Sequence, residues 1–258
     1  MTHYKAVCFD LDGTVYKENE PIEESVAFLK SLAGTSADAY FITNNSSHTR
    51  EQIVRKLAAF GIETDESHIM TSAIAAAEYC ARELHGRTIQ MIGEAGLEEA
   101  LAEKGIRTVS RGGDVVVMGI DHGITYDKLA DACLSIRAGA EFIATNGDLS
   151  VPGKEGLVPG NGAFAELVRS STGVAPVIVG KPESYMLEFI RQESGVRKDE
   201  MIMIGDNYDT DILSGIRYGI DTIHLEGGVT PRELVLSKPE QPTHVFKSLA
   251  DWKDHQLF

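Results

Sequence analysis

The feature that most constrains this chain is a short apolar run near its start that ends at two carboxylates. The run is Ala6-Val7-Cys8-Phe9, and Asp10-Leu11-Asp12-Gly13-Thr14 follows it directly. Four consecutive apolar residues are typical of a strand that is buried on both faces, as the strands of a parallel sheet are. Ligands of open parallel sheets bind outside the carboxyl ends of the strands. The sequence therefore predicts a binding crevice that begins at Asp10.

The same pattern, an apolar run that stops at polar residues, recurs further along the chain. The runs cover residues 39–42, 176–179 and 201–204, and they end at Thr43-Asn44-Asn45, Gly180-Lys181-Pro182 and Gly205-Asp206-Asn207. Helical spacing of apolar residues between runs indicates the crossover connections that parallel strands require. We therefore expect an α/β fold built on a doubly wound parallel sheet.

The middle of the chain has its own strands and helices. Strands are expected over 88–92, 115–118 and 142–145, helices over 97–104 and 126–138, and a long loop rich in glycine and proline over 146–162. This set interrupts the first pattern, which returns with the run that ends at Lys181. We therefore expect a core domain made of residues 1–80 and 178–258 and an inserted α/β domain over residues 81–177, both of ordinary domain size.

The acidic composition narrows the class of ligand. The 258 residues carry 39 acidic and 24 basic side chains, for a formal charge of −15, which would repel a nucleic-acid polymer. A small phosphorylated ligand fits if a cation screens the nearby acids. No apolar run approaches the roughly 18 residues that span a membrane. The cysteines Cys8, Cys80 and Cys133 are odd in number, which predicts reduced thiols in a cytoplasmic protein.

The polar residues after the four runs form a chemically coherent set. If the runs are parallel neighbours, Asp10, Asp12, Thr43, Asn44, Lys181 and Asp206 meet at one edge of the sheet. A spacing of two places Asp10 and Asp12 on the same side of an extended backbone. Three carboxylates in one place require a cation, and oxygen ligands with open positions favour Mg²⁺. Lys181 and the Thr43 hydroxyl complete a predicted phosphate clamp.

Two carboxylates in such a clamp can take two different catalytic roles in the hydrolysis of a phosphate ester. One can attack phosphorus to form an aspartyl phosphate, and the other can give a proton to the leaving oxygen. A covalent intermediate beside a metal suits an ester that resists hydrolysis as strongly as a phosphate monoester does.

Four segments of the chain resemble the motifs of the haloacid dehalogenase (HAD) superfamily of phosphatases. In order they are Phe9-Asp10-Leu11-Asp12-Gly13-Thr14, Thr43-Asn44-Asn45, Lys181-Pro182, and Gly205-Asp206 with Thr210-Asp211. Residues 139–146 and 159–162 resemble the large α/β cap of the NagD-like 4-nitrophenylphosphatase subgroup. The resemblance implies a Rossmann-like core with an inserted cap that shapes substrate choice, and it allows a homodimer.

The resemblance also implies residue roles. Asp10 would be the nucleophile, and Asp12 would be the general acid and later the base for water. Magnesium would be held by the Asp10 carboxylate, the Asp12 backbone carbonyl and Asp206, with Asp211 in support. The residues that hold the phosphoryl group would be Thr43, Asn44, Asn45 and Lys181. The implied reaction is magnesium-dependent hydrolysis of small phosphorylated metabolites, such as nucleoside monophosphates, sugar phosphates or nitrophenyl phosphate.

Two other functions fit parts of the pattern. A phosphomutase of the same superfamily would return the phosphoryl group to its substrate instead of releasing it to water. A phospho-accepting receiver domain shares an acidic cluster, a threonine and a lysine on a parallel sheet, but needs only about half this length and no cap. A dehalogenase is disfavoured because Asp12 and a metal would have no task there. The leaving group is not specified by the sequence.

Overall fold

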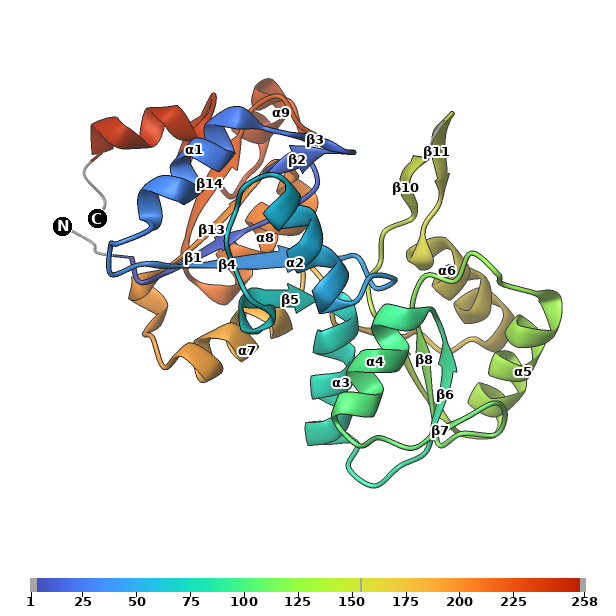
Figure 1. Cartoon of the computed structure of the whole chain (residues 1–258). Coiled ribbons are helices and arrows are strands. Elements are labelled where there is room, and N and C mark those ends of the chain that lie inside the picture. Colours follow the sequence, from blue (N-terminus) through green and yellow to red (C-terminus); the bar gives the residue numbers. More distant parts are fainter. Residues whose placement is uncertain (1–3, 154, 256–258) are drawn as a thin grey trace. The chain divides into compact units, whose positions relative to one another are not determined.

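The chain forms two compact units in the computed structural model, which describes residues 4–153 and 155–255. The core unit consists of the chain up to Thr43, Glu51–Met70 and the chain from Lys181 onward. The inserted unit consists of Asn44–Arg50 and Thr71–Gly180. Figure 1 draws most of the core unit in blue and in orange to red, and most of the inserted unit in green and yellow.

The core unit is built on a six-stranded sheet in the order β15-β14-β13-β1-β4-β5. The strands are β1 (Ala6–Phe9), β4 (Asp38–Thr43), β5 (Ile69–Thr71), β13 (Met201–Gly205), β14 (Asp221–Leu225) and β15 (His244–Phe246). Strand β1 pairs in parallel with β13 on one side and with β4 on the other, and Phe9 lies opposite Ile204 and Phe41. The apolar runs at β1, β4 and β13 therefore form neighbouring parallel strands, as expected.

Helices cover both faces of this sheet. They are α1 (Glu23–Leu32), α2 (Arg50–Ala59), α7 (Tyr185–Ser194), α8 (Leu213–Tyr218) and α9 (Arg232–Ser237). Val7 and Phe9 of β1 join a buried cluster with residues of α1 and α2. On the opposite face α8 lies close to β13, since a Cβ added at Gly215 would be 3.2 Å from the Met203 Cβ. The expectation of a doubly wound α/β fold is confirmed.

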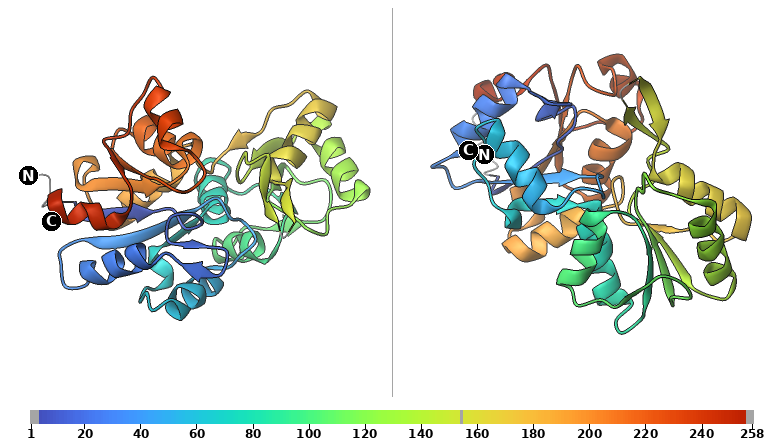
Figure 2. Two further views of the ribbon diagram at one scale, coloured as in Figure 1. Left: turned by 90° about the horizontal axis from the view of Figure 1, so that it is seen from above. Right: turned by 45° about the vertical axis from the view of Figure 1, so that its right-hand side comes forward.

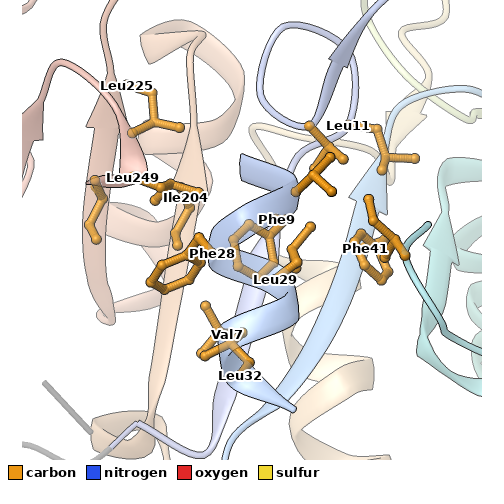
Figure 3. Close-up of a cluster of buried hydrophobic side chains, with 14 of the residues drawn as sticks. Val7, Phe9, Leu11, Phe28, Leu29, Leu32, Phe41, Ile204, Leu225 and Leu249 are labelled. Carbon is orange, nitrogen blue, oxygen red and sulfur yellow. The ribbon is translucent and has the colours of Figure 1, made fainter. Parts of the chain in front are cut away.

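The core cluster is centred on aromatic rings, as Figure 3 shows for Phe9, Phe28 and Phe41. The ring of Phe9 lies 6.1 Å from the ring of Phe28 and 6.1 Å from that of Phe41. Phe28 also packs against Trp252, at 5.1 Å between ring centroids. Tilted ring pairs at these separations stabilise beyond their buried area by about 0.5–1.5 kcal/mol. Strand β1, which leads to Asp10, is thus anchored in the aromatic centre of this cluster.

The inserted unit has a parallel five-stranded sheet of its own, in the order β12-β9-β8-β6-β7. Its strands are β6 (Ile89–Ile92), β7 (Thr108–Val109), β8 (Val115–Met118), β9 (Glu141–Ala144) and β12 (Val177–Ile178). Its helices are α3 (Ser72–Glu83), α4 (Ala95–Glu103), α5 (Tyr126–Arg137) and α6 (Asn161–Thr172). Figures 1 and 2 show α3 and α4 on one face of this sheet and α5 and α6 on the other.

The strand that precedes Lys181 differs from its expected place. It was expected to continue the core pattern, but β12 pairs with β9 of the inserted sheet, with Val177 opposite Ile143 and Ile178 opposite Ala144. An apolar run that ends at polar residues indicates a strand but carries no information about its partner. The chain leaves β12 and enters the core unit only at Lys181.

The observed division of the chain also differs from the expected boundaries at residues 81 and 177. Helix α3 packs against α4 and belongs to the inserted unit, as does the short segment Asn44–Arg50. The Asn44 carbonyl accepts hydrogen bonds from Ser72 Oγ at 2.6 Å and from Asn146 Nδ2 at 2.8 Å. These bonds join three segments that are distant in sequence, so local patterns do not indicate them.

The expected long loop over 146–162 contains a hairpin, formed by β10 (Ser150–Gly153) and β11 (Gly156–Pro159). Its residues are mostly exposed, so the sequence lacks the apolar alternation that would indicate strands. Further short elements were also not expected: β2 (Tyr16–Lys17), β3 (Glu20–Pro21), the 3₁₀ helices Glu66–His68, Lys198–Glu200 and Leu249–His255, and the π-helical turn Tyr208–Ile212. Within the described residues, every helix is too short or too polar to cross a membrane.

We expect Phe28→Ala to lower the free energy of unfolding of the core unit by about 3–5 kcal/mol, because the truncation leaves a cavity beside Phe9 and Trp252. Urea unfolding followed by the fluorescence of Trp252, the single tryptophan, reports on this cluster. The control is Leu234→Ala, whose side chain is 47% exposed and whose loss should change stability by less than about 0.5 kcal/mol. Equal stability of the two variants would contradict this account of the core.

Candidate active site

Three of the predicted site residues lie at the ends of neighbouring strands, at one edge of the core sheet. Asp10 follows β1 directly, Asp206 follows β13, and Thr43 is the last residue of β4. The Asp10 N–H donates to the Ile204 carbonyl at 2.9 Å, which continues the strand pairing up to the site. Because the three strands are parallel and in register, their carboxyl ends lie at the same edge.

The centre of the site is a cluster of three buried carboxylates, Asp10, Asp206 and Asp211. Each offers an oxygen, and these oxygens lie within 4.8 Å of one another. Burial, with the Asp211 charge adding to it, raises the pKa of Asp206 to about 6. Burial is also the main reason that the pKa of Asp10 lies well above its usual range. The protein thus holds carboxylates where their ionised forms are unfavourable without a nearby cation.

Lys181 supplies one such cation. Its ammonium lies 2.5 Å from Asp10 Oδ1 and 2.7 Å from Asp211 Oδ1, and it also donates to the Ile42 carbonyl at 3.2 Å. Burial disfavours a charged ammonium, but the two carboxylates outweigh that effect and raise the pKa of Lys181. Lys181 therefore stays charged although it is only 3% exposed.

One ammonium cannot balance three carboxylates, so ionisation of all three leaves a surplus of negative charge. Buried carboxylate oxygens with surplus charge are the donor set that hard divalent cations prefer, and Mg²⁺ takes one or two carboxylates together with water or substrate phosphate oxygens. The residues present thus fit a divalent metal, and Asp10 and Asp206 offer carboxylate oxygens for it.

The Asp206 carboxylate is held from several directions. The Val229 N–H donates to Oδ2 at 2.7 Å, and the Thr14 hydroxyl donates to Oδ1 at 3.2 Å. Two glycines lie against it: an added Cβ would be 2.4 Å from Oδ2 at Gly13 and 1.9 Å from Oδ2 at Gly228. Any larger residue at either position would displace the carboxylate or the backbone.

Asp211 lies in the π-helical turn after β13 and takes part in the cluster itself. The Asn207 N–H donates to its Oδ2 at 3.0 Å, and the Thr210 hydroxyl donates to its Oδ1 at 3.2 Å. Its carboxylate pairs with Lys181. The sequence singled out Asp211 as a supporting residue, and its contacts make it a partner of the charged lysine.

Asp12 has a different environment from Asp10. Asp10 is buried, whereas Asp12 is exposed and lies in a turn whose backbone pairs with Tyr16. The strand ends at Phe9, so the alternation of an extended chain does not continue through Asp12. Among the described residues, the carboxylates that lie close enough together to hold a metal are those of Asp10, Asp206 and Asp211. The carboxylate of Asp12 is not in this set.

The residues of the second motif are divided between the two units. Thr43 is buried at the end of β4 in the core unit, whereas Asn44 and Asn45 belong to the inserted unit. Asn44 Nδ2 donates to both carboxylate oxygens of Asp148, at 3.2 and 3.1 Å. Asn45 Oδ1 accepts from the N–H groups of residues 47 and 48, at 3.0 and 2.9 Å. A role of either side chain in phosphate binding stays a prediction.

Sequence reasoning missed the loop over residues 226–230, which contacts Asp206 through Gly228 and Val229. A usable signal was present. The strand over 222–225 also ends at a polar residue and a glycine pair, Glu226-Gly227-Gly228, which is the pattern that indicated the other strand ends.

Comparison with known proteins decides the family. Residues 7–107 match the haloacid dehalogenase-like hydrolase family, and residues 178–252 match a HAD-hydrolase-like family. The chain belongs to the haloacid dehalogenase-like hydrolases. It is 43% identical to the 5'-nucleotidase YutF of Bacillus subtilis over 252 residues, and this alignment covers 98% of each of the two chains. It is 42% identical to an acid sugar phosphatase of Staphylococcus saprophyticus, over 96% of each chain.

Solved structures agree with this membership. A double mutant of a thermostable NPPase from Geobacillus stearothermophilus superposes with a TM-score of 0.92 at 44% identity, over 98% of this chain and 99% of that one. A 4-nitrophenylphosphatase from Thermotoga maritima gives a TM-score of 0.92 at 32% identity, over 97% of both chains. The chain is thus a NagD-like HAD phosphatase, a hydrolase of phosphoric monoesters, and its buried acidic cluster is compatible with a divalent metal.

We expect Gly13→Ala to lower phosphatase turnover by about 10²-fold, because the added Cβ must displace the Asp206 carboxylate. Gly34→Ala is the matched control: its φ of +87° is close to the +95° of Gly13, but nothing lies within 4 Å of its added Cβ. Both variants should lose about 1–2 kcal/mol of stability from backbone strain. Equal loss of turnover in the two variants would show that strain alone, and not contact with Asp206, is responsible.

Proposed function

We propose that this protein is a magnesium-dependent phosphomonoesterase that hydrolyses small phosphorylated metabolites through an aspartyl phosphate on Asp10. The observation that carries the proposal is the buried Asp10 carboxylate, which touches the charged Lys181 and lies beside Asp206 and Asp211. A nucleophile at the end of a rigid, buried strand is held in a fixed position, which lowers the entropic part of the barrier.

In the first step a carboxylate oxygen of Asp10 attacks phosphorus, and the bond from phosphorus to the ester oxygen breaks. Asp12 gives its proton to the departing ester oxygen. In the second step Asp12 takes a proton from water, whose oxygen attacks the phosphoryl group and releases Asp10 and inorganic phosphate. The exposed position of Asp12 suits this task because water can reach its carboxylate for the second step.

Binding of the phosphoryl group falls to residues that offer positive charge or hydrogen-bond donors. Lys181 contributes a buried ammonium, and Thr43 contributes a hydroxyl at the end of β4. Asn44 and Asn45 follow Thr43 in the chain and complete the proposed set. Charged and polar donors fixed before the reaction stabilise the charge that develops on the phosphoryl oxygens.

Magnesium would be held by the carboxylates of Asp10 and Asp206 and by the backbone carbonyl of Asp12. Asp211 would support the site through Lys181, which it contacts at 2.7 Å. The ion would neutralise charge on the phosphoryl oxygens and reduce the repulsion between the substrate and the carboxylates.

The relatives suggest the substrate class. Their names include a 5'-nucleotidase and acid sugar phosphatases, so nucleoside monophosphates and sugar phosphates are the proposed substrates, with nitrophenyl phosphate as a convenient one. The inserted unit would act as the cap that selects among them. The three cysteines are buried and unbonded, which supports a reducing compartment such as the cytoplasm.

We expect Asp10→Asn to lower hydrolysis of nitrophenyl phosphate by about 10⁴-fold or more, because the amide cannot act as a nucleophile. Chelation of divalent cations should abolish the activity of the unmodified protein, and added Mg²⁺ should restore it. The matched control is Asp38→Asn, the same change at the exposed beginning of β4, which should keep full activity. Full activity of Asp10→Asn would refute the proposal.

We expect the effect of Asp12→Asn to depend on the leaving group. Nitrophenolate leaves as a stabilised anion, whereas the hydroxyl of a sugar or nucleoside needs a proton. Release of the leaving group in a single turnover should therefore slow by about 10²–10⁴-fold for a sugar phosphate, and by much less for nitrophenyl phosphate. Equal slowing for both esters would mean that Asp12 does not protonate the leaving oxygen.

A further inference from the structure

The loop after β14 is joined to Asp206 through Thr230, a residue that uses all of its polar atoms. Its N–H donates to the Asp206 carbonyl at 3.1 Å, and its hydroxyl oxygen accepts from the Tyr208 N–H at 3.0 Å. Its carbonyl accepts from His224 Nε2 at 3.0 Å. Thr230 is only 3% exposed, so water has little access to the groups that form these hydrogen bonds.

The hydrogen bond to the Thr230 carbonyl determines which ring nitrogen of His224 carries a hydrogen. A carbonyl oxygen only accepts, so Nε2 must carry the hydrogen. Burial lowers the pKa of His224, which favours the neutral ring, so Nδ1 is left as an acceptor. Nδ1 is buried and has no hydrogen-bond partner among the described residues.

If position 224 served only to pack the sheet, an aliphatic side chain would be more stable there than an imidazole. His224 is completely buried on β14, on the face of the sheet opposite to the apolar side chains of Ile223 and Leu225. A buried acceptor without a partner lowers stability, and an aliphatic side chain would avoid that loss. What the imidazole adds, and an aliphatic side chain could not, is a donor aimed at the Thr230 carbonyl.

The residue that receives this hydrogen bond is next in the chain to a residue that contacts the carboxylate of Asp206. Val229 precedes Thr230, and its N–H donates to Asp206 Oδ2 at 2.7 Å. Gly228 lies so close to the same oxygen that no Cβ would fit. A restraint on the Thr230 carbonyl therefore restrains the peptide groups that contact Asp206.

We propose that His224 is a positioning residue for the metal site, which acts through Thr230 to hold the 226–230 loop against the Asp206 carboxylate. The inference rests on the proposed function only in taking Asp206 as a metal ligand. Outer partners that orient a metal ligand typically change metal affinity by about 10–100-fold when they are removed.

The test compares three replacements of His224. Leu removes the donor, Gln can place an amide N–H near the position of Nε2, and Asn places one nearer that of Nδ1. Mn²⁺ serves as a paramagnetic probe, and its dissociation constant is measured by electron paramagnetic resonance on the full chain without substrate. We expect His224→Leu and His224→Asn to weaken Mn²⁺ binding by about 10-fold or more, and His224→Gln to restore it largely.

The kinetic readout should separate positioning from general damage. The Mg²⁺ concentration for half-maximal hydrolysis of nitrophenyl phosphate should rise in His224→Leu, while KM for the ester at saturating Mg²⁺ stays near that of the unmodified protein. The control is Thr222→Val, a buried position on the same face of β14 whose hydroxyl accepts from the Thr243 N–H instead. It should leave Mn²⁺ affinity unchanged.

The Asp206→Asn variant shows whether a negative result contradicts the proposed function or only the inference about His224. If this variant binds Mn²⁺ normally, the proposed function is wrong about Asp206. If it binds weakly while His224→Leu binds normally, the inference about His224 is overturned. If circular dichroism shows that His224→Leu does not fold, the comparison of Gln with Asn decides, and equal Mn²⁺ affinity of these two would overturn the inference.

Discussion

The buried pairing of Lys181 with the carboxylates of Asp10 and Asp211 is the interaction on which the rest of the site depends. Removing an ion from water costs several kcal/mol, so a buried charge must find a partner with good geometry. Here one ammonium serves two carboxylates, while Asp206 relies on N–H and hydroxyl donors. The surplus of negative charge over the single ammonium makes this edge of the sheet a favourable place for a cation.

Close approach of the backbone is the means by which the core unit holds this cluster. Glycines lie where a Cβ would collide with a carboxylate: Gly13 and Gly228 against Asp206, and Gly205 against Asp211. Peptide N–H groups can thereby reach the acids directly. The carboxylates are positioned by the main chain of strand ends and loops, and the strands that lead to Asp10 and Asp206 are packed into the cluster around Phe9. Membership of the HAD-like hydrolases is consistent with a chemistry that depends on such fixed geometry.

Much of the fold and of the site was predictable because the signals are local. The apolar runs before Asp10, Thr43 and Asp206 indicated the three central strands, and the polar residues after them indicated the acidic edge. Strand β12 shows where such reasoning ends, since its run resembles the others but pairs with the inserted sheet. The hairpin within residues 146–162 was missed because its strands are mostly exposed and gain backbone hydrogen bonds rather than an apolar face.

The sequence by itself determined the kind of most of the main elements and the order of the motifs that resemble those of the HAD superfamily, because hydrophobic period and motif spacing are properties of neighbouring residues. Only the tertiary structure decided that Lys181 bridges Asp10 and Asp211, that Asp12 is exposed while Asp10 is buried, and that the 226–230 loop lies against Asp206. These features join segments up to about 200 residues apart, and such contacts depend on how whole elements pack rather than on any local pattern.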